Sequence, residues 1–162
     1  MKIVIADTSA LISLALVRQI DLIEKIFGDF YIANAVWEEL LKYEDLLIDS
    51  ELIARFEKHV IKIKSSNYLS VIMDYGESES VILYKELNAD FFLVDDNKAR
   101  IIAESLNVNC IGSIGLLIKA KEKNIITRLR PNFAKWITEE RYFSVKLLNK
   151  ILENYGEQPL KY

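Results

Sequence analysis

The amino-acid sequence predicts an α/β protein of three-layer α/β/α architecture, in which helices cover both faces of a central parallel sheet of four to five strands. Short apolar runs alternate with helical segments along the chain, which is the pattern of strand–helix–strand units. The first run, residues 2–6, is β-branched and apolar after its lysine, as expected of a strand buried on both faces. The 162 residues include only two prolines and five glycines and show no internal repeat, so we expect a single domain over 1–162.

Capping residues place the first helices. Thr8 or Ser9 is expected to cap a helix that follows the first strand and ends near Val17. A second short helix is predicted over residues 21–27, and Gly28 ends it, because glycine commonly follows the last turn of a helix.

The next elements lead to the middle of the chain. The short apolar run 30–33 predicts a strand, and Asn34 is expected to cap the helix "AVWEELLKY" that comes after it. A further helix over residues 51–58 and a strand over 60–64, "VIKIK", complete this part.

The clearest alternation lies within residues 76–111. A helix over 77–87 leads to the strand 91–94, and a second helix over 97–106 leads to the short apolar run 108–111. This pitch of strand and helix indicates parallel strands. Three further helices are expected after it, over residues 113–123, 130–139 and 144–154.

Composition and charge exclude several functional classes. The net charge of −3 gives no overall basic field that would hold nucleic acid, so any such role must depend on local patches. The single cysteine, Cys110, can form no internal disulfide and suggests a reducing compartment. No stretch is long and apolar enough to span a membrane, and Asp7 interrupts the run where a signal peptide needs continuity. We therefore expect a cytoplasmic protein.

Acidic residues follow two of the predicted strands directly. Asp7 comes after the first strand, and Asp95 and Asp96 come after "FFLV". Ligands of open parallel sheets bind just beyond the carboxyl ends of the strands, so these carboxylates are expected at one edge of the sheet.

Helical phase adds three glutamates to this edge. Glu39 lies roughly 110° from the centre of the apolar face of its helix, close enough to lean toward a cleft. Glu77 lies within roughly 60° of the inward stripe of its helix and Glu79 about 100° away. Both also occupy the first turn, where glutamate stabilises the helix dipole without any further purpose.

If these groups converge, cations are needed to hold them together. Unit charges about 4 Å apart repel by roughly 4 kcal/mol at an effective dielectric constant near 20. Mg²⁺ and Mn²⁺ prefer oxygen ligands and keep water molecules that can be activated for phosphoryl displacement. The pattern therefore predicts one or two divalent ions, Mg²⁺ or Mn²⁺, with Asp7 as a ligand.

At this point the chain resembles a known family. The order "IADTSALI", "VWEEL", "YGESESVIL" and "FFLVDDNKAR" resembles the PIN domain, and in particular a small prokaryotic branch related to toxin ribonucleases. The resemblance extends from residue 2 to about 154, and "GESES" followed by "LVDD" is also similar to the paired acids of flap endonucleases. It implies a parallel sheet flanked by helices, and metal-dependent cleavage of single-stranded RNA.

The resemblance also implies a role for each residue. Asp7 corresponds to the first acid of the family and Ser9 to the hydroxyl after it. The remaining ligand positions correspond to Glu39, to Glu77 with Glu79 as its companion, and to Asp95, whose place Asp96 could also take.

A basic segment is the candidate nucleic-acid surface. It contains Lys119, Lys121, Lys123, Arg128 and Arg130. These cations could hold a phosphate backbone beside the acidic cleft, and Trp136, Tyr142 and Phe143 nearby could stack on bases. A solvated helix face with core aromatics is the alternative interpretation.

The expected activity is that of an Mg/Mn-dependent endoribonuclease. The resemblance makes the chain a candidate toxin of a toxin–antitoxin pair with an antitoxin as partner, and a homodimer is the expected assembly. A catalytically silent PIN-like interaction module and a small-molecule phosphohydrolase are the alternatives. The chain has no GxGxxG, P-loop or GxSxG motif, and its lone histidine, His59, has no second histidine or nearby cysteine to bind zinc with it.

Overall fold

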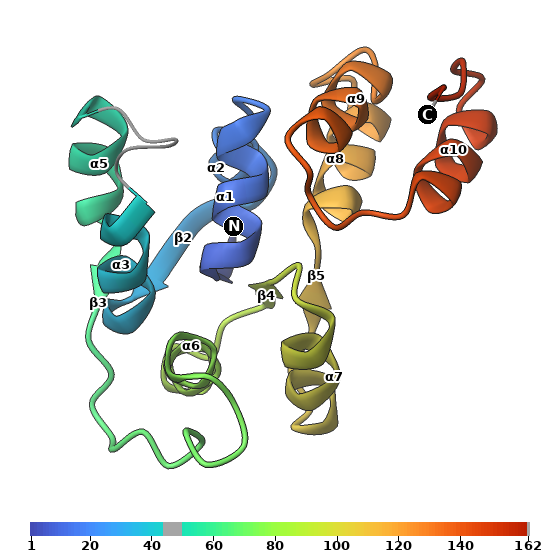
Figure 1. The fold of residues 1–162 in the computed structure, drawn as a ribbon. Coiled ribbons are helices and arrows are strands. Elements are labelled where there is room, and N and C mark those ends of the chain that lie inside the picture. The colour runs from blue at the N-terminus through green and yellow to red at the C-terminus, as the bar shows by residue number, and fades with distance from the viewer. Residues whose placement is uncertain (44–49, 162) are drawn as a thin grey trace.

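The computed structural model describes residues 1–43 and 50–161, and a parallel sheet lies at its centre (Figure 1). Its five strands, all parallel, are arranged in the order β3-β2-β1-β4-β5. They are β1 (Lys2–Ala6), β2 (Gly28–Ala33), β3 (Val60–Ile61), β4 (Phe91–Leu93) and β5 (Cys110–Ile111). In the register, Ile5 of the central strand lies opposite Tyr31 on one side and Phe92 on the other.

Helices cover both faces of this sheet, which confirms the predicted three-layer α/β/α class. Helices α6 and α7 lie on one face, and α1, α2 and α8 lie on the other (Figure 1). The first half of the chain contributes α1 (Thr8–Leu16), α2 (Leu22–Phe27), α3 (Asn34–Leu40), the 3₁₀ helix η1 (Leu41–Tyr43) and α5 (Ser50–Glu57). The second half contributes α6 (Tyr75–Glu86), α7 (Asn97–Ser105), α8 (Ser113–Glu122), α9 (Arg130–Thr138) and α10 (Val145–Asn154).

Burial explains why β1 is the central strand. Its residues Val4, Ile5 and Ala6 are fully buried, as a strand covered by helices on both faces requires. Phe30 of β2 and Phe92 of β4 are fully buried beside it. The strand therefore ends inside the molecule, and the residue that follows it lies next to apolar side chains.

Several predicted boundaries differ from the structure, one because of a local hydrogen bond and one because of a tertiary one. The cap of α1 is Asp7, whose side chain accepts the amide of Ser9, so neither Thr8 nor Ser9 is the capping residue. The strand predicted over 60–64 ends at Ile61. Beyond it, the amide of Lys64 donates to the Glu86 carboxylate at 3.0 Å, which draws the chain away from the sheet.

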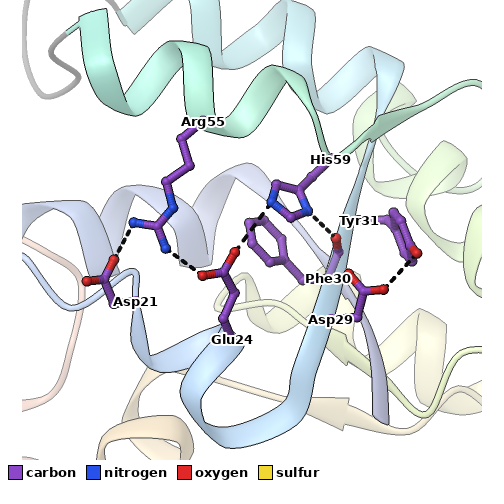
Figure 2. Close-up of polar contacts among 7 residues, drawn as sticks. All are labelled: Asp21, Glu24, Asp29, Phe30, Tyr31, Arg55 and His59. Carbon is purple, nitrogen blue, oxygen red and sulfur yellow. Dashed lines mark hydrogen bonds and ion pairs between the residues drawn. The ribbon is translucent and has the colours of Figure 1, made fainter. Parts of the chain in front are cut away.

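A polar cluster holds α5 and β3 against α2 and β2 (Figure 2). Arg55 donates to Asp21 at 2.5 Å and to Glu24 at 2.7 Å. The His59 ring stacks on Phe30 with 4.0 Å between centroids, and its Nδ1 lies 2.9 Å from the Phe30 carbonyl oxygen. His59 Nε2 lies 3.4 Å from Glu24, so the histidine bridges two elements of the fold.

Candidate active site

A cavity opens at the carboxyl edge of the sheet, and acidic side chains dominate its lining. Asp7 reaches it from the end of β1, Asp95 and Asp96 from the end of β4, and Glu39 from α3. Glu77 reaches it from the first turn of α6. The structure therefore brings these five carboxylates together at one edge of the sheet, as the sequence predicts. Asp74, just before α6, lines the same cavity.

Asp7 is the most deeply buried of these acids, with 3% of its surface exposed. Its Oδ2 accepts hydrogen bonds from the Ser9 hydroxyl at 2.6 Å and from the Ser9 amide at 3.1 Å. Burial raises the pKa of Asp7 to about 6, and the charge of Glu39 acts in the same direction, while the bonds from Ser9 partly oppose both. Asp7 is therefore a carboxylate that costs free energy to ionise in the folded protein.

Ser9 joins the ends of two strands. While its hydroxyl donates to Asp7, its Oγ accepts the amide of Asp95 at 3.0 Å and the amide of Asp96 at 3.4 Å. One hydroxyl has one proton and two lone pairs, so these three contacts use all its hydrogen-bonding capacity. Ser9 therefore fixes the position of Asp7 relative to the two acids that follow the neighbouring strand, β4.

Glu77 and Glu39 form the other side of the cavity. The pKa of Glu77 is raised to about 7, mainly by burial and in addition by the charges of Asp7, Asp96 and Asp74. Glu39 accepts the Thr8 hydroxyl through Oε2 at 3.1 Å. Burial and mutual repulsion together thus disfavour full ionisation of these carboxylates at neutral pH.

Two glycines let backbone approach these carboxylates. A Cβ atom on Gly76 would lie 3.1 Å from Glu39 Oε2, and one on Gly112 would lie 3.2 Å from Asp95 Oδ1. Both distances are tighter than ordinary carbon–oxygen contacts, so a side chain at either position would displace an acid.

Asp95 and Asp96 are positioned by different partners. Asp95 accepts the amide of Ser113 through Oδ1 and its hydroxyl through Oδ2, both at 2.7 Å. Asp96 is the cap of α7, where its Oδ1 accepts the Ala99 amide at 2.8 Å. Both residues line the cavity, so both acids after β4 face the predicted ligand set.

Glu79 does not lie among the residues that line this cavity. Its side chain is buried and accepts the amide of Ala35 through Oε2 at 2.9 Å, at the start of α3. Two residues along a helix correspond to a rotation of about 200°, so Glu79 leaves α6 in nearly the opposite direction from Glu77. The expectation that Glu79 accompanies Glu77 in the site is therefore corrected: Glu79 supplies the capping bond that was predicted from Asn34.

The basic segment lies away from the acids. None of Lys119, Lys121, Lys123, Arg128 and Arg130 is among the residues that line the cavity in the described part of the chain. Ser113, at the first residue of α8, contacts the site, whereas the basic residues lie in the last turn of that helix and beyond it. Lys121 pairs with Glu157 at 3.1 Å, and Arg130 donates to the carbonyl oxygens of Gln158 and Pro159, so both hold the C-terminal tail.

No local sequence pattern marks several residues of the site. Ser113 is separated from Asp95 by 18 positions and Arg141 from Ser9 by 132, and both contacts exist only in the folded chain. Tyr142 and Phe143, which were candidates for base stacking, do line the cavity. Trp136 does not, because it is fully buried and donates its Nε1 proton to the Ser13 carbonyl oxygen at 2.7 Å.

Within residues 1–43 and 50–161, the acids of the cavity have no cationic partner of their own. Among the described residues, no ion pair involves Asp7, Glu39, Glu77, Asp95 or Asp96. In the same part of the chain, no three histidine, cysteine or acidic side chains stand together as a ready-made metal-binding group. Mg²⁺ is commonly held by one or two carboxylates together with water and substrate phosphates, and that requirement fits an open lining of oxygen ligands better than a closed cage would.

Comparison with known proteins adds one finding about the whole chain. A family model described as a PIN domain matches residues 3–157. No curated protein matches the sequence. Among the helices that the structure describes, none is long and apolar enough to cross a bilayer.

Proposed function

Because the chain belongs to the PIN-domain family, whose members are generally nucleases, we propose that it is an Mg²⁺- or Mn²⁺-dependent endoribonuclease that hydrolyses phosphodiester bonds of single-stranded RNA. The observation that carries the proposal is the gathering of Asp7, Glu39, Glu77 and the Asp95–Asp96 pair in one cavity, where no ion pair within the described residues involves them. Carboxylates arranged in this way repel a phosphodiester unless cations are present. The same carboxylate oxygens would be the ligands of those cations.

Each residue has a role in this proposal. Asp7, Glu39, Glu77 and Asp95 would hold one or two divalent ions, with Asp96 as a further oxygen ligand at the end of β4. A bound divalent ion supplies a water molecule of lowered pKa and neutralises charge on the scissile phosphate. Ser9 would keep Asp7 oriented, because its hydroxyl and amide both donate to Oδ2 of that carboxylate.

The proposal extends to the biological setting. A ribonuclease of this kind would act in the cytoplasm, and a toxin role would need an antitoxin as its inhibitor. The loop before α6 supports a protein partner or a homodimer, because it leaves Tyr68, Val71 and Ile72 exposed by 54%, 86% and 49%. The basic residues at the far end of α8 would contact RNA only where a long strand leaves the cavity.

The direct test compares Asp7→Asn with Asp29→Asn. Asp29 lies near the start of β2, at the opposite edge of the sheet, and its carboxylate accepts the Tyr31 hydroxyl at 2.8 Å (Figure 2). We expect Asp7→Asn to abolish Mn²⁺-dependent cleavage of single-stranded RNA while the protein stays folded, and Asp29→Asn to cleave like the wild type. Full activity of Asp7→Asn would refute the proposal.

Calorimetric titration with Mn²⁺ separates the nuclease from its alternatives. A nuclease should bind the ion, and Asp7→Asn should weaken that binding. A folded wild-type protein that binds no Mn²⁺ at millimolar concentration would instead be a catalytically silent interaction module. Turnover of a chromogenic phosphate monoester with RNA left intact would indicate a small-molecule phosphohydrolase.

A further inference from the structure

The connection between α9 and α10 brings three consecutive residues to the rim of the acidic cavity. They are Arg141, Tyr142 and Phe143. Arg141 is fixed to α1, since its Nε and Nη2 donate to Ser13 Oγ at 3.2 and 2.9 Å and its Nη2 also donates to the Ser9 carbonyl oxygen at 2.9 Å. The guanidinium is therefore held against the backbone of Ser9, which lies two residues after Asp7.

The other neighbour of Tyr142 is also fixed. The Phe143 ring packs on the indole of Trp136, with 4.4 Å between centroids, and Trp136 is fully buried. The amide of Phe143 donates to the Arg141 carbonyl oxygen at 2.8 Å, which makes the turn tight. Tyr142 stands between these two anchors with 99% of its surface exposed. Its ring contributes almost no buried area to the fold, although its backbone is well positioned.

Arg141 differs from every other residue of the lining in charge. Among the described residues that line the cavity, it is the only cation, whereas six are acidic. Its Nε proton and both Nη2 protons are used by Ser13 and Ser9. In the described part of the chain no hydrogen bond uses Nη1, so two N–H donors of a preorganised guanidinium remain for a ligand. A phosphate oxygen is an acceptor that matches the charge and geometry of a guanidinium.

We propose that Arg141 and Tyr142 hold the nucleotide next to the one that is cleaved. Arg141 donates to its phosphate through Nη1, and the Tyr142 ring stacks on its base. The inference rests on the proposed nuclease function and adds two substrate-binding residues to it. Only an unpaired base exposes a free face to a protruding ring, so this pair favours a single strand over a duplex.

Two oligomers distinguish the two contacts. One is a fluorescein-labelled oligouridylate, and the other is a ribose–phosphate oligomer of the same length that lacks bases. Binding is measured by fluorescence anisotropy with Ca²⁺ in place of Mg²⁺, and a gel confirms that each oligomer is intact afterwards. Tyr142→Ala should weaken binding of the oligouridylate roughly 5- to 150-fold, the range measured for loss of one stacking contact, and leave binding of the abasic oligomer unchanged. Tyr142→Phe should bind both like the wild type.

Arg141→Gln should weaken binding of both oligomers, because a phosphate contact does not depend on the base. It should also make the salt dependence shallower, reducing the slope of log K against log salt by about 0.7 for one lost phosphate contact to a single strand. Loss of fold alone would not change that slope in this way. Tyr68→Ala is the matched control, since Tyr68 is 54% exposed and does not line the cavity.

The outcomes separate this inference from the proposed function. If the wild type cleaves RNA and Tyr142→Ala binds the oligouridylate normally, the inference is wrong and the nuclease stands. If Tyr142→Ala weakens both oligomers equally, base stacking is wrong. If the wild type cleaves nothing with Mn²⁺ but binds RNA in a Tyr142-dependent way, the nuclease proposal fails, and the base and phosphate contacts stand as RNA-binding contacts only. A wild type that binds neither oligomer overturns the inference.

Discussion

Both carboxylate oxygens of Asp95 accept hydrogen bonds from Ser113, one from its amide and one from its hydroxyl, each at 2.7 Å. Asp95 follows β4, whereas Ser113 begins α8, so the orientation of the acid is set by the helix that follows the neighbouring strand. Gly112 makes this close approach possible, because a Cβ there would lie 3.2 Å from Asp95 Oδ1. Asp95 is thus a fixed element of the cavity rather than a freely rotating side chain.

Ser113→Ala should therefore impair the site more than the fold. The variant loses one buried hydrogen bond to a carboxylate, worth about 1–2 kcal/mol in the free energy of unfolding. Groups that orient metal-binding carboxylates commonly change affinity or activity roughly 10–100-fold, and we expect a loss of RNA cleavage in that range. Cleavage rates and urea denaturation measure the two effects. Ser105→Ala, whose exposed hydroxyl donates only to the Ile102 carbonyl oxygen, is the control. Unchanged cleavage by Ser113→Ala would show that the anchoring of Asp95 has no role in activity.

Asp7→Asn should stabilise the protein at alkaline pH, although we expect it to abolish RNA cleavage. The folded-state pKa of Asp7 is about 6 against an ordinary value of 3.8. Below pH 3.8 the acid is protonated in both states and folding carries no ionisation cost. As the pH rises from 3.8 through 6, the unfolded chain loses the proton more readily, so the free energy of unfolding falls. The shift corresponds to about 3 kcal/mol at pH 8, and an uncharged asparagine avoids this cost. Urea denaturation should show the variant to be more stable than the wild type at pH 8, with the difference shrinking toward pH 4. A variant less stable than the wild type at pH 8 would contradict this explanation.

The sequence was sufficient for the fold class because the strands are short apolar runs between helical segments. Val4, Ile5 and Ala6 are fully buried, and their apolar, largely β-branched character already predicts that burial. Element ends were less predictable, since they depend on distant partners. The carboxylate that receives the Lys64 amide, for example, belongs to Glu86 of another element.

The same distinction applies to the site. Asp7 and Asp95 could be located because an acid directly after a buried strand has to emerge at the carboxyl edge of the sheet. Ser113 and Arg141 could not, because each acts through a tertiary contact that no local pattern encodes. Glu79 shows how phase estimates fail: a position about 100° from the inward stripe is compatible with both a cavity and a neighbouring helix, and here packing of α6 on α3 decides.

Glu77 and Glu79 form a natural pair for separating activity from stability. Glu77→Gln should abolish cleavage without destabilising the protein, because the pKa of Glu77 is raised to about 7 and its ionised form is disfavoured in the fold. Glu79→Gln retains an oxygen that can accept the Ala35 amide, so cleavage and stability should both be close to those of the wild type. Glu79→Ala removes the cap and should lower the free energy of unfolding by about 1–2 kcal/mol while the folded protein still cleaves RNA. The prediction fails if Glu79→Gln loses activity as Glu77→Gln does.

Divalent ions should bind with an affinity that rises with pH and should displace protons as they bind. Without metal, Asp7 and Glu77 have pKa values of about 6 and about 7, so at pH 6 the two groups together carry between one and two protons. A cation that needs both carboxylates ionised must release these protons, and the release should fade above pH 8. Mn²⁺ titrations at pH 6 and pH 8, each in two buffers of different protonation enthalpy, measure both the affinity and the proton count. Glu77→Gln should release fewer protons at pH 6 than the wild type. An affinity that does not change between the two pH values would mean that the bound ion does not contact these carboxylates.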